Sequence, residues 1–148
     1  MSQNQVYRKK LCTKEKIAQA ASDLFSRKGF YTVSIRDICK EVGIKESTIY
    51  YHYTNKQAIL NYLLERIDSL IEAKQSAFDH AFNLAQTVSV EDMQMVAVNL
   101  LTDYLLHPYV QKVISMLSIE RMHSKEVAEK YQRIVFELPL AQQRKVFQ

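Results

Sequence analysis

Three tyrosines and a histidine occupy four consecutive positions, Tyr50 to Tyr53, with a lysine on either side at Lys45 and Lys56. Phenol, imidazole and ammonium groups donate hydrogen bonds, and anionic oxygens are acceptors that suit them. A hydrophobic core explains one or two of these rings, and the others need a different partner. The stretch therefore has the chemistry of a binding surface for an anion.

A short helix over residues 46–53 would sort these side chains by face. With 100° between successive residues, Ile49 and Tyr53 lie about 40° apart and define an inner face. We therefore expect Tyr53 to belong to the core and Tyr51 to be exposed. The positions that point outward or lie on the flanks are Ser47, Thr48, Tyr50, Tyr51 and His52.

Two earlier helices are needed to position this one. Thr13 is the predicted N-cap of the first helix, and Gly29 ends it. Ser34 and Asp37 form a variant of the capping box at the start of the second, and Gly43 stops it. Two short helices joined by a tight turn, after a stabilising first helix, are the sequence form of a helix-turn-helix.

A helix-turn-helix predicts double-stranded DNA as the anionic partner, with helix 46–53 in the major groove. Tyr51 would meet base edges, while Tyr50 and His52 would donate to phosphates on either side. Lys56 begins the fourth helix, where free N–H groups favour a phosphate, and Arg36 has the side chain best suited to guanine. The predicted DNA contacts are Arg36, Lys45, Ser47, Thr48, Tyr50, Tyr51, His52 and Lys56.

The charge distribution agrees with an anionic partner for the first part of the chain only. The net charge of +4 combines +6 on residues 1–56 with −2 on residues 57–148. A basic N-terminal third on a mildly acidic body indicates that the polyanion binds the first part. A solvated basic face without a partner is the alternative reading of the charge alone.

The composition predicts an all-α protein. The 148 residues include only two glycines and two prolines, too few for the turns of a β protein, and 47% are apolar. No apolar run approaches the roughly 20 residues that span a bilayer, and we expect no secretory signal. The two cysteines form no CxxC pair. The bacterial cytoplasm is the expected location.

The fourth helix is predicted to be long. Apolar residues keep helical spacing from Leu60 to about residue 83, and a helix of about 28 residues would extend roughly 42 Å. Such a helix is too long for one small domain, so it should start in the basic module and end in the body. We assign residues 1–56 to a DNA-binding domain with a basic arm, and residues 57–148 to a helical effector-binding and dimerisation domain.

Boundaries within this second part follow from capping residues. Thr54 and Gln57 form a predicted capping box at the start of the long helix. Ser89 and Ser124 are the predicted N-caps of two later helices. Pro139 is expected to interrupt the last helix, because proline lacks the N–H of a helical residue.

The segments IAQAASDLFSRKGF and SIRDICKEVGIKESTIYYHYTNKQAIL closely resemble the DNA-binding domain of the tetracycline-repressor (TetR) family. The resemblance covers Thr13 to Leu60, about a third of the chain, and implies a three-helix module joined to a larger all-helical ligand-binding domain. Cys39 stands where the family usually has alanine, which should alter packing only. Positions that commonly touch DNA in the family correspond to Arg36, Thr48, Tyr50, Tyr51, His52 and Lys56.

From Leu63 onward the resemblance is one of architecture. It implies a body that holds an apolar or amphipathic effector between helices and dimerises through its last two long helices. The chain is shorter than is usual for the family, so we expect the body to be incomplete and to lack those helices. The candidate effector contacts are Phe78, Phe82, Leu101, Tyr104, Met116 and Tyr131.

The sequence thus predicts a one-component transcriptional regulator, most simply a repressor that binds a palindromic operator as a homodimer and is released by a small effector. The alternative is a helical adaptor, or an architectural DNA-binding remnant, that senses nothing. No cofactor is expected, since the four histidines lack metal-ligand spacing. No serine, histidine and aspartate group together, so an enzyme is not expected.

Overall fold

The computed structural model describes residues 12–85 and 89–146, and within these ranges the chain is helical without a strand. The chain divides into two compact units, Met1–Glu65 and Arg66–Gln148. The predicted all-α class is therefore confirmed. No helix in the described ranges has the length and hydropathy needed to cross a membrane.

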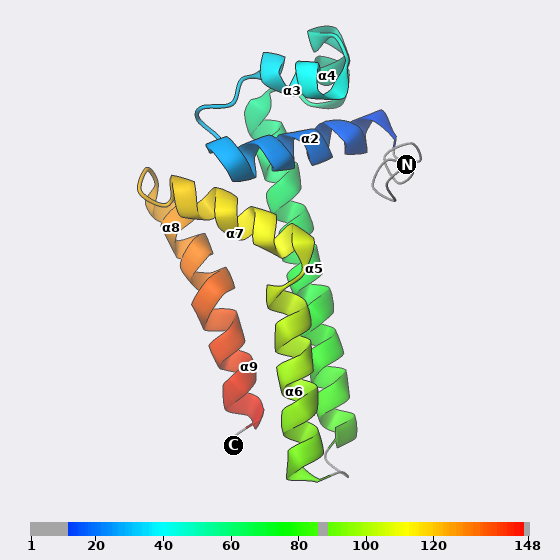
Figure 1. The fold of residues 1–148 in the computed structure, drawn as a ribbon, viewed down its shortest axis with the longest axis vertical. Coiled ribbons are helices and arrows are strands. Elements are labelled where there is room, and N and C mark those ends of the chain that lie inside the picture. Colours follow the sequence, from blue (N-terminus) through cyan, green and yellow to red (C-terminus); the bar gives the residue numbers. More distant parts are fainter. Residues whose placement is uncertain (1–11, 86–88, 147–148) are drawn as a thin grey trace. The chain divides into compact units, whose positions relative to one another are not determined.

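The first unit contains α2 (Thr13–Lys28), α3 (Ile35–Val42), α4 (Glu46–His52) and the beginning of α5 (Lys56–Ala85), as Figure 1 shows. Each helix contributes a fully buried side chain to one core, including Phe25, Ile38, Ile49 and Ile59. The predicted helix-turn-helix is thus present, with α3 and α4 as its two short helices.

The turn between α3 and α4 depends on Gly43. Its φ of 76° and ψ of 38° lie in the left-handed region, which glycine adopts without a steric penalty. The N–H groups of Gly43 and Ile44 both donate to the carbonyl of Cys39, at 2.8 and 3.0 Å. This closes α3 and directs the chain into α4, as the sequence predicted.

Two predicted caps were wrong by one residue. Cys12, not Thr13, is the N-cap of α2. Asn55, not Thr54, caps α5, because its Oδ1 accepts from the N–H of Ala58 at 2.8 Å. Asparagine is at least as good an N-cap as threonine, so the cap one position later is favoured.

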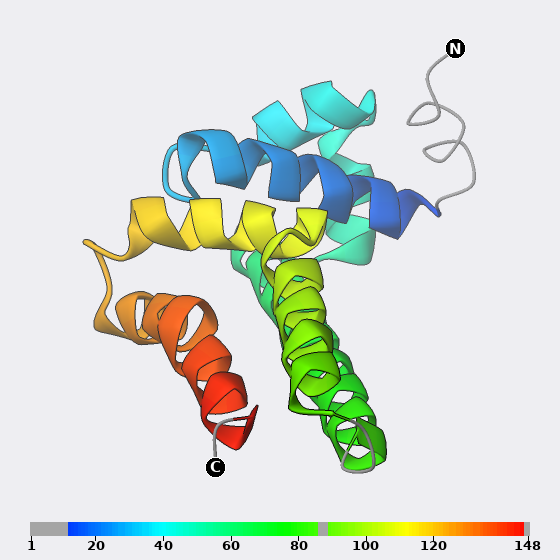
Figure 2. The same cartoon turned by 60° about the horizontal axis from the view of Figure 1, so that its bottom comes forward.

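The second unit contains the rest of α5 with α6 (Val90–Leu105), α7 (Pro108–Glu120), α8 (Lys125–Gln132), a π-helical segment η1 (Arg133–Glu137) and α9 (Leu138–Val146). Figures 1 and 2 both show α5 and α6 side by side, and the ion pair between Lys74 and Asp103 joins them. Ser89 and Ser124 cap α6 and α8 as predicted. The long α5 ends at Ala85, close to its predicted end.

The predicted interruption at Pro139 was wrong. The helical segments α8, η1 and α9 follow one another from Lys125 to Val146, and Pro139 is the second residue of α9. In η1 the N–H of Leu138 donates to the carbonyl of Arg133, five residues earlier. A π-turn before the proline, and the tolerance of the first helical turn for a missing N–H, let the helix continue.

Candidate nucleic-acid interface

Helix α4 has one buried and one exposed face. Ile49 is fully buried and Tyr53 is 5% exposed, whereas Tyr51 is 84% exposed and Tyr50 is 52% exposed. Ser47 is also exposed, and Thr48 and His52 are half-buried. The predicted inner face is confirmed. Contact of the outer residues with DNA stays a prediction.

Contacts at the C-terminal end of α4 hold this orientation. The hydroxyl of Tyr53 donates to the carbonyl of Lys14 in α2 at 3.2 Å, and its ring meets that of Tyr62 in α5 edge to face at 5.7 Å. The ammonium of Lys14 lies 4.9 Å from the centre of the Tyr62 ring. These contacts therefore connect α2, α5 and the end of α4, and they hold the helix that carries the exposed tyrosines.

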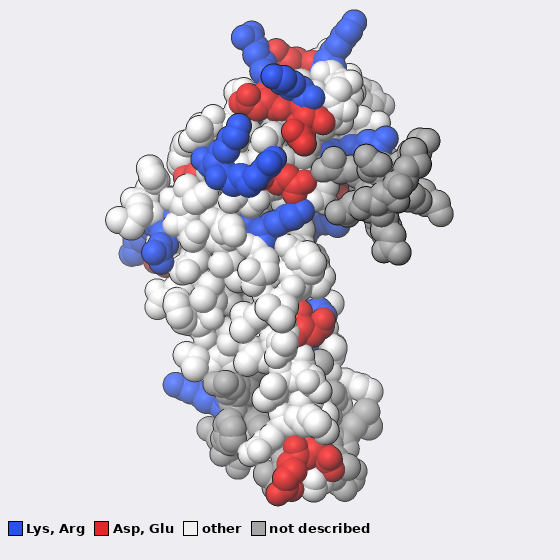
Figure 3. Space-filling view, in the orientation of Figure 1, with Lys and Arg blue, Asp and Glu red and all other residues white. Residues whose placement is uncertain are grey.

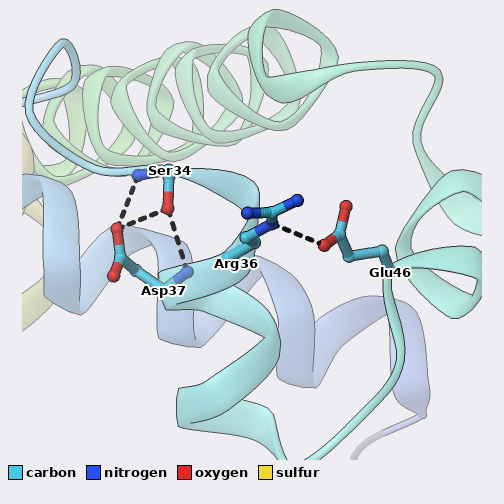
Figure 4. A network of polar contacts seen from close by, with 4 residues as sticks. All are labelled: Ser34, Arg36, Asp37 and Glu46. Carbon is cyan, nitrogen blue, oxygen red and sulfur yellow. Dashed lines mark hydrogen bonds and ion pairs between the residues drawn. The ribbon is translucent and has the colours of Figure 1, made fainter.

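Cations flank the exposed face of α4. Figure 3 shows Lys and Arg side chains gathered over the first unit, with carboxylates among them. Lys45 is exposed and is the N-cap of α4. Arg36 lies in the first turn of α3, and its Nε is 3.0 Å from Oε1 of Glu46 in α4 (Figure 4). Glu46 was not among the predicted site residues, although opposite charges in the first turns of the two helices were a signal for it.

Lys56 has an additional role that the sequence did not indicate. Its ammonium donates to the carbonyls of Phe30 and Val33, both at 2.8 Å, and lies 4.3 Å from the centre of the Phe30 ring. The side chain therefore binds the turn between α2 and α3 to the first residue of α5. A phosphate contact by Lys56 remains a prediction, now beside an observed structural role.

The start of α3 is fixed by the predicted capping box. The N–H of Asp37 donates to Ser34 Oγ at 3.2 Å, and the N–H and hydroxyl of Ser34 donate to Asp37 Oδ2 at 2.8 and 2.6 Å (Figure 4). These hydrogen bonds to the ionised carboxylate lower the pKa of Asp37. The backbone that carries Arg36 is thereby held in place.

Cys39 is buried in the core of the first unit. Burial raises the pKa of its thiol, and the negative charge of Glu46 raises it further. A thiol with a raised pKa is a poor nucleophile, which agrees with a packing role.

The candidate effector residues of the body have different environments. Tyr104 and Met116 are buried, whereas Leu101 and Tyr131 are half-buried. The side chains of Phe78 and Phe82 lie outside those that the structure describes. A surface depression of about 310 Å³ is lined by Glu129, Lys130, Gln132, Arg133 and Glu137, and none of the four candidates with described side chains lines it. The effector contacts remain a prediction.

Residues 17–63 match the family model described as bacterial regulatory proteins, tetR family. This segment of the N-terminal unit is therefore similar to the tetR family of bacterial regulatory proteins. The matched segment includes Arg36, all of α4 and Lys56. No group of three potential metal ligands occurs among the described residues.

Two curated proteins that are similar to this chain are named HTH-type transcriptional regulators. The HTH-type transcriptional regulator UidR of Escherichia coli K12 is 35% identical over 52 residues, which is 35% of this chain and 26% of UidR. The biofilm operon icaADBC HTH-type negative transcriptional regulator IcaR of Staphylococcus epidermidis is 48% identical over 46 residues, 31% of this chain and 25% of IcaR. The chain therefore spans about a quarter of the length of these curated relatives.

The similarity in fold extends beyond the matched segment. A solved structure assigned to the TetR family of transcriptional regulators, from Mesorhizobium loti, superposes with a TM-score of 0.56 over 90% of this chain and 65% of that one. Its sequence identity is 19%, so the likeness concerns the fold alone. The predicted architecture, a helix-turn-helix unit followed by a helical unit, is confirmed.

Proposed function

We propose that this protein is a DNA-binding transcriptional regulator that reads double-stranded DNA with α4. The observation that carries the proposal is the division of α4 into a core face and an exposed face with two tyrosines, inside a segment of the tetR family. In this proposal Tyr51 meets base edges, and Tyr50, His52 and Lys45 meet phosphates. Arg36 adds a guanidinium to the same surface.

The regulator acts as a repressor, bound to a palindromic operator as a homodimer. Support for repression comes from IcaR, which is named a negative transcriptional regulator. A symmetric dimer fits a palindrome because its two α4 helices meet half-sites about 34–36 Å apart. A small apolar or amphipathic effector in the helical body, acting in the cytoplasm, releases the operator. Residues 1–56 form the DNA-binding domain in this proposal, and residues 57–148 form the effector-binding and dimerisation domain.

Selection of DNA from a randomised double-stranded library by the full 148-residue chain tests the proposal. We expect enrichment of a palindromic sequence, which gel-shift titration should show to bind more tightly than random DNA. Tyr51→Ala should lower this preference, and Met122→Ala, which truncates a side chain that is 84% exposed in the second unit, should not. Absence of any enriched sequence would contradict the proposal.

The effector part is tested separately. Small-molecule extracts of the source cell should contain a fraction that lowers the affinity for the selected DNA. Sequence-specific binding that no fraction changes would favour the alternative, an architectural DNA-binding protein without sensing.

A further inference from the structure

We propose that Glu46 determines base specificity by positioning Arg36, and that its carboxylate also weakens binding to unrelated DNA. This inference rests on the proposed DNA-binding function. Glu46 does not read a base in this proposal. It acts through the guanidinium of Arg36.

The contact joins the two helices of the helix-turn-helix. Arg36 is the second residue of α3 and Glu46 is the first residue of α4, and the Arg36 Nε lies 3.0 Å from Glu46 Oε1 (Figure 4). The Arg36 side chain is 85% exposed and the Glu46 side chain is 44% exposed. In the described part of the chain, the two terminal nitrogens of Arg36 have no hydrogen-bond partner.

Asp37 follows Arg36 in the sequence, but its carboxylate already accepts hydrogen bonds from Ser34. Asp37 Oδ2 accepts from both the N–H and the hydroxyl of Ser34, which caps α3. The cap fixes the backbone of the first turn of α3, and the contact with Glu46 favours one orientation of the Arg36 guanidinium. Arg36 is therefore partly oriented before DNA arrives, which reduces the entropy lost on binding.

The nitrogen of Arg36 that contacts Glu46 determines which nitrogens remain available for a base. Since Nε faces Glu46, the two terminal nitrogens form the edge that is left for a ligand. Guanine presents two acceptors, O6 and N7, in the major groove, and a bidentate arginine contact discriminates against other bases by roughly ten- to a hundredfold. In this orientation the two terminal nitrogens of Arg36 can donate to O6 and N7 of one guanine, and contacts to acceptors on neighbouring bases are less favoured.

The charge of Glu46 has a separate effect. Binding to unrelated DNA comes almost wholly from positive charge near phosphates. An exposed carboxylate at the start of α4 repels phosphates and offsets the positive charge of Arg36. Exposed ion pairs are weak, so Glu46 neither traps Arg36 nor prevents its contact with a base. Glu46 thus lowers the affinity for random DNA without blocking the specific contact.

The test uses the full chain, random duplex DNA, and the duplex selected from a randomised library by the wild type. Single base-pair changes across that duplex locate the base pair at which Arg36→Ala loses discrimination. Glu46→Ala should lose discrimination at the same base pair, by up to about fivefold, the range for an exposed ion pair, and should bind random DNA more tightly than the wild type. The double variant Arg36→Ala/Glu46→Ala should discriminate there no worse than Arg36→Ala alone.

Glu46→Gln separates the two effects, because its amide oxygen still accepts a hydrogen bond but carries no charge. It should retain discrimination at the Arg36 base pair and share the tighter binding to random DNA. Glu41→Ala, which removes an exposed carboxylate elsewhere on α3, is the matched control and should leave that discrimination unchanged. Thermal melts should show the Glu46 variants folded like the wild type, since the side chain is 44% exposed.

Three results would overturn the inference. If Glu46→Ala keeps the discrimination that Arg36→Ala loses, Glu46 does not position Arg36. If Glu46→Ala loses discrimination at a different base pair, Glu46 reads a base by itself. If the wild type selects no sequence at all, the proposed function fails and the inference fails with it, and this outcome is visible before any variant is made.

Discussion

Tyr51 and Tyr53 are two residues apart in the sequence, yet their surroundings are opposite. Tyr53 is 5% exposed and donates a hydrogen bond to Lys14, whereas Tyr51 is 84% exposed. Tyr53→Ala should therefore destabilise the protein by about 3–5 kcal/mol, as aromatic truncations in cores do. Tyr51→Ala should change stability by no more than about 0.5 kcal/mol and lower the preference for selected DNA.

Urea unfolding of both variants checks this prediction. If Tyr51→Ala proved the more destabilising of the two, the exposed face of α4 would have to be redrawn. Tyr53→Phe, which removes only the hydroxyl, should cost about 1 kcal/mol, the usual contribution of one hydrogen bond.

Lys56 combines a structural contact with a predicted phosphate contact. Its ammonium donates to the carbonyls of Phe30 and Val33, so Lys56→Ala should lower the free energy of unfolding by about 1.5–3 kcal/mol, the range for charged hydrogen bonds. It should also reduce the magnitude of the slope of log K against log salt by about one. Lys40→Ala, which truncates an exposed lysine of α3, is the control for stability.

Urea unfolding and salt titration separate the two roles of Lys56. A variant with normal stability would exclude the structural role, and an unchanged salt slope would exclude the phosphate contact. The structural role could not be predicted from sequence, because the acceptors are backbone carbonyls in a turn more than twenty residues away. Helical periodicity identifies which face a residue occupies, but not a backbone oxygen that lies opposite it.

Among the helices, α3 depends on the cap that Asp37 completes. Hydrogen bonds from Ser34 lower the pKa of Asp37 below 3.8, its ordinary value. A carboxyl group whose pKa is lower in the folded state stabilises the protein above its unfolded pKa, and this contribution is lost as the pH falls through the folded pKa. Asp37→Asn should therefore destabilise the protein at neutral pH, and the difference from wild type should shrink as the pH falls below about 4.

Unfolding by urea at pH 7 and at pH 3 measures that difference. Glu41→Gln removes a carboxylate that makes no capping bond from the same helix. The difference in the free energy of unfolding between this variant and the wild type should not shrink in the same way as the pH falls. A pH-independent effect of Asp37→Asn would mean that the cap acts through side-chain shape and not through charge.

Helix η1 is joined to α6 by the buried Tyr104, whose hydroxyl donates to the carbonyl of Ile134 at 3.2 Å. Burial raises the pKa of Tyr104 to about 12. The protonated phenol is thus favoured in the folded state. Its contribution to the stability of the fold is complete below the unfolded pKa of 10.0 and is lost as the pH rises to about 12. Tyr104→Phe should cost about 1 kcal/mol at pH 7.

Absorbance at 295 nm provides the direct measurement, because Tyr104→Phe should remove one ionisation step near pH 12. The same variant should approach wild-type stability as the pH rises from 10 to 12. A late ionisation step that survives the substitution would belong to another tyrosine.

The sequence indicated helices better than it indicated their ends. Gly29, Gly43, Ser34, Ser89 and Ser124 all mark helix ends as predicted, because each has a single local reason to do so. The predicted cap at Thr54 was wrong because its neighbour Asn55, a residue type that ranks above threonine as an N-cap, takes that role. The predicted interruption at Pro139 was wrong because a π-turn precedes the proline, and no residue pattern in the sequence predicts such a turn.

At the scale of the whole molecule, the described side chains of the two units differ in the kind of apolar group that they expose. The exposed large apolar residues of the first unit are Tyr31, Tyr50 and Tyr51, all with a hydroxyl. Those of the second unit carry no polar group capable of donating, and they are Met95, Val98, Leu106, Ile119, Met122, Phe136 and Leu140. Tyrosine suits a polar partner such as DNA, whereas aliphatic surfaces suit another protein surface.

This difference predicts that the chain associates with itself through its second unit, as the proposed homodimer requires. Phe136 and Leu140, each 52% exposed, lie four residues apart, a spacing that places them on one side of a helix. Replacing both with lysine should shift sedimentation equilibrium at micromolar concentration toward the monomer, because charge opposes burial of the surface. Tyr51→Lys, an equal change in the first unit, should leave the association unchanged. A wild-type chain that sediments as a monomer and still binds a palindromic duplex tightly would exclude this contact, and DNA itself would then bring the two copies together.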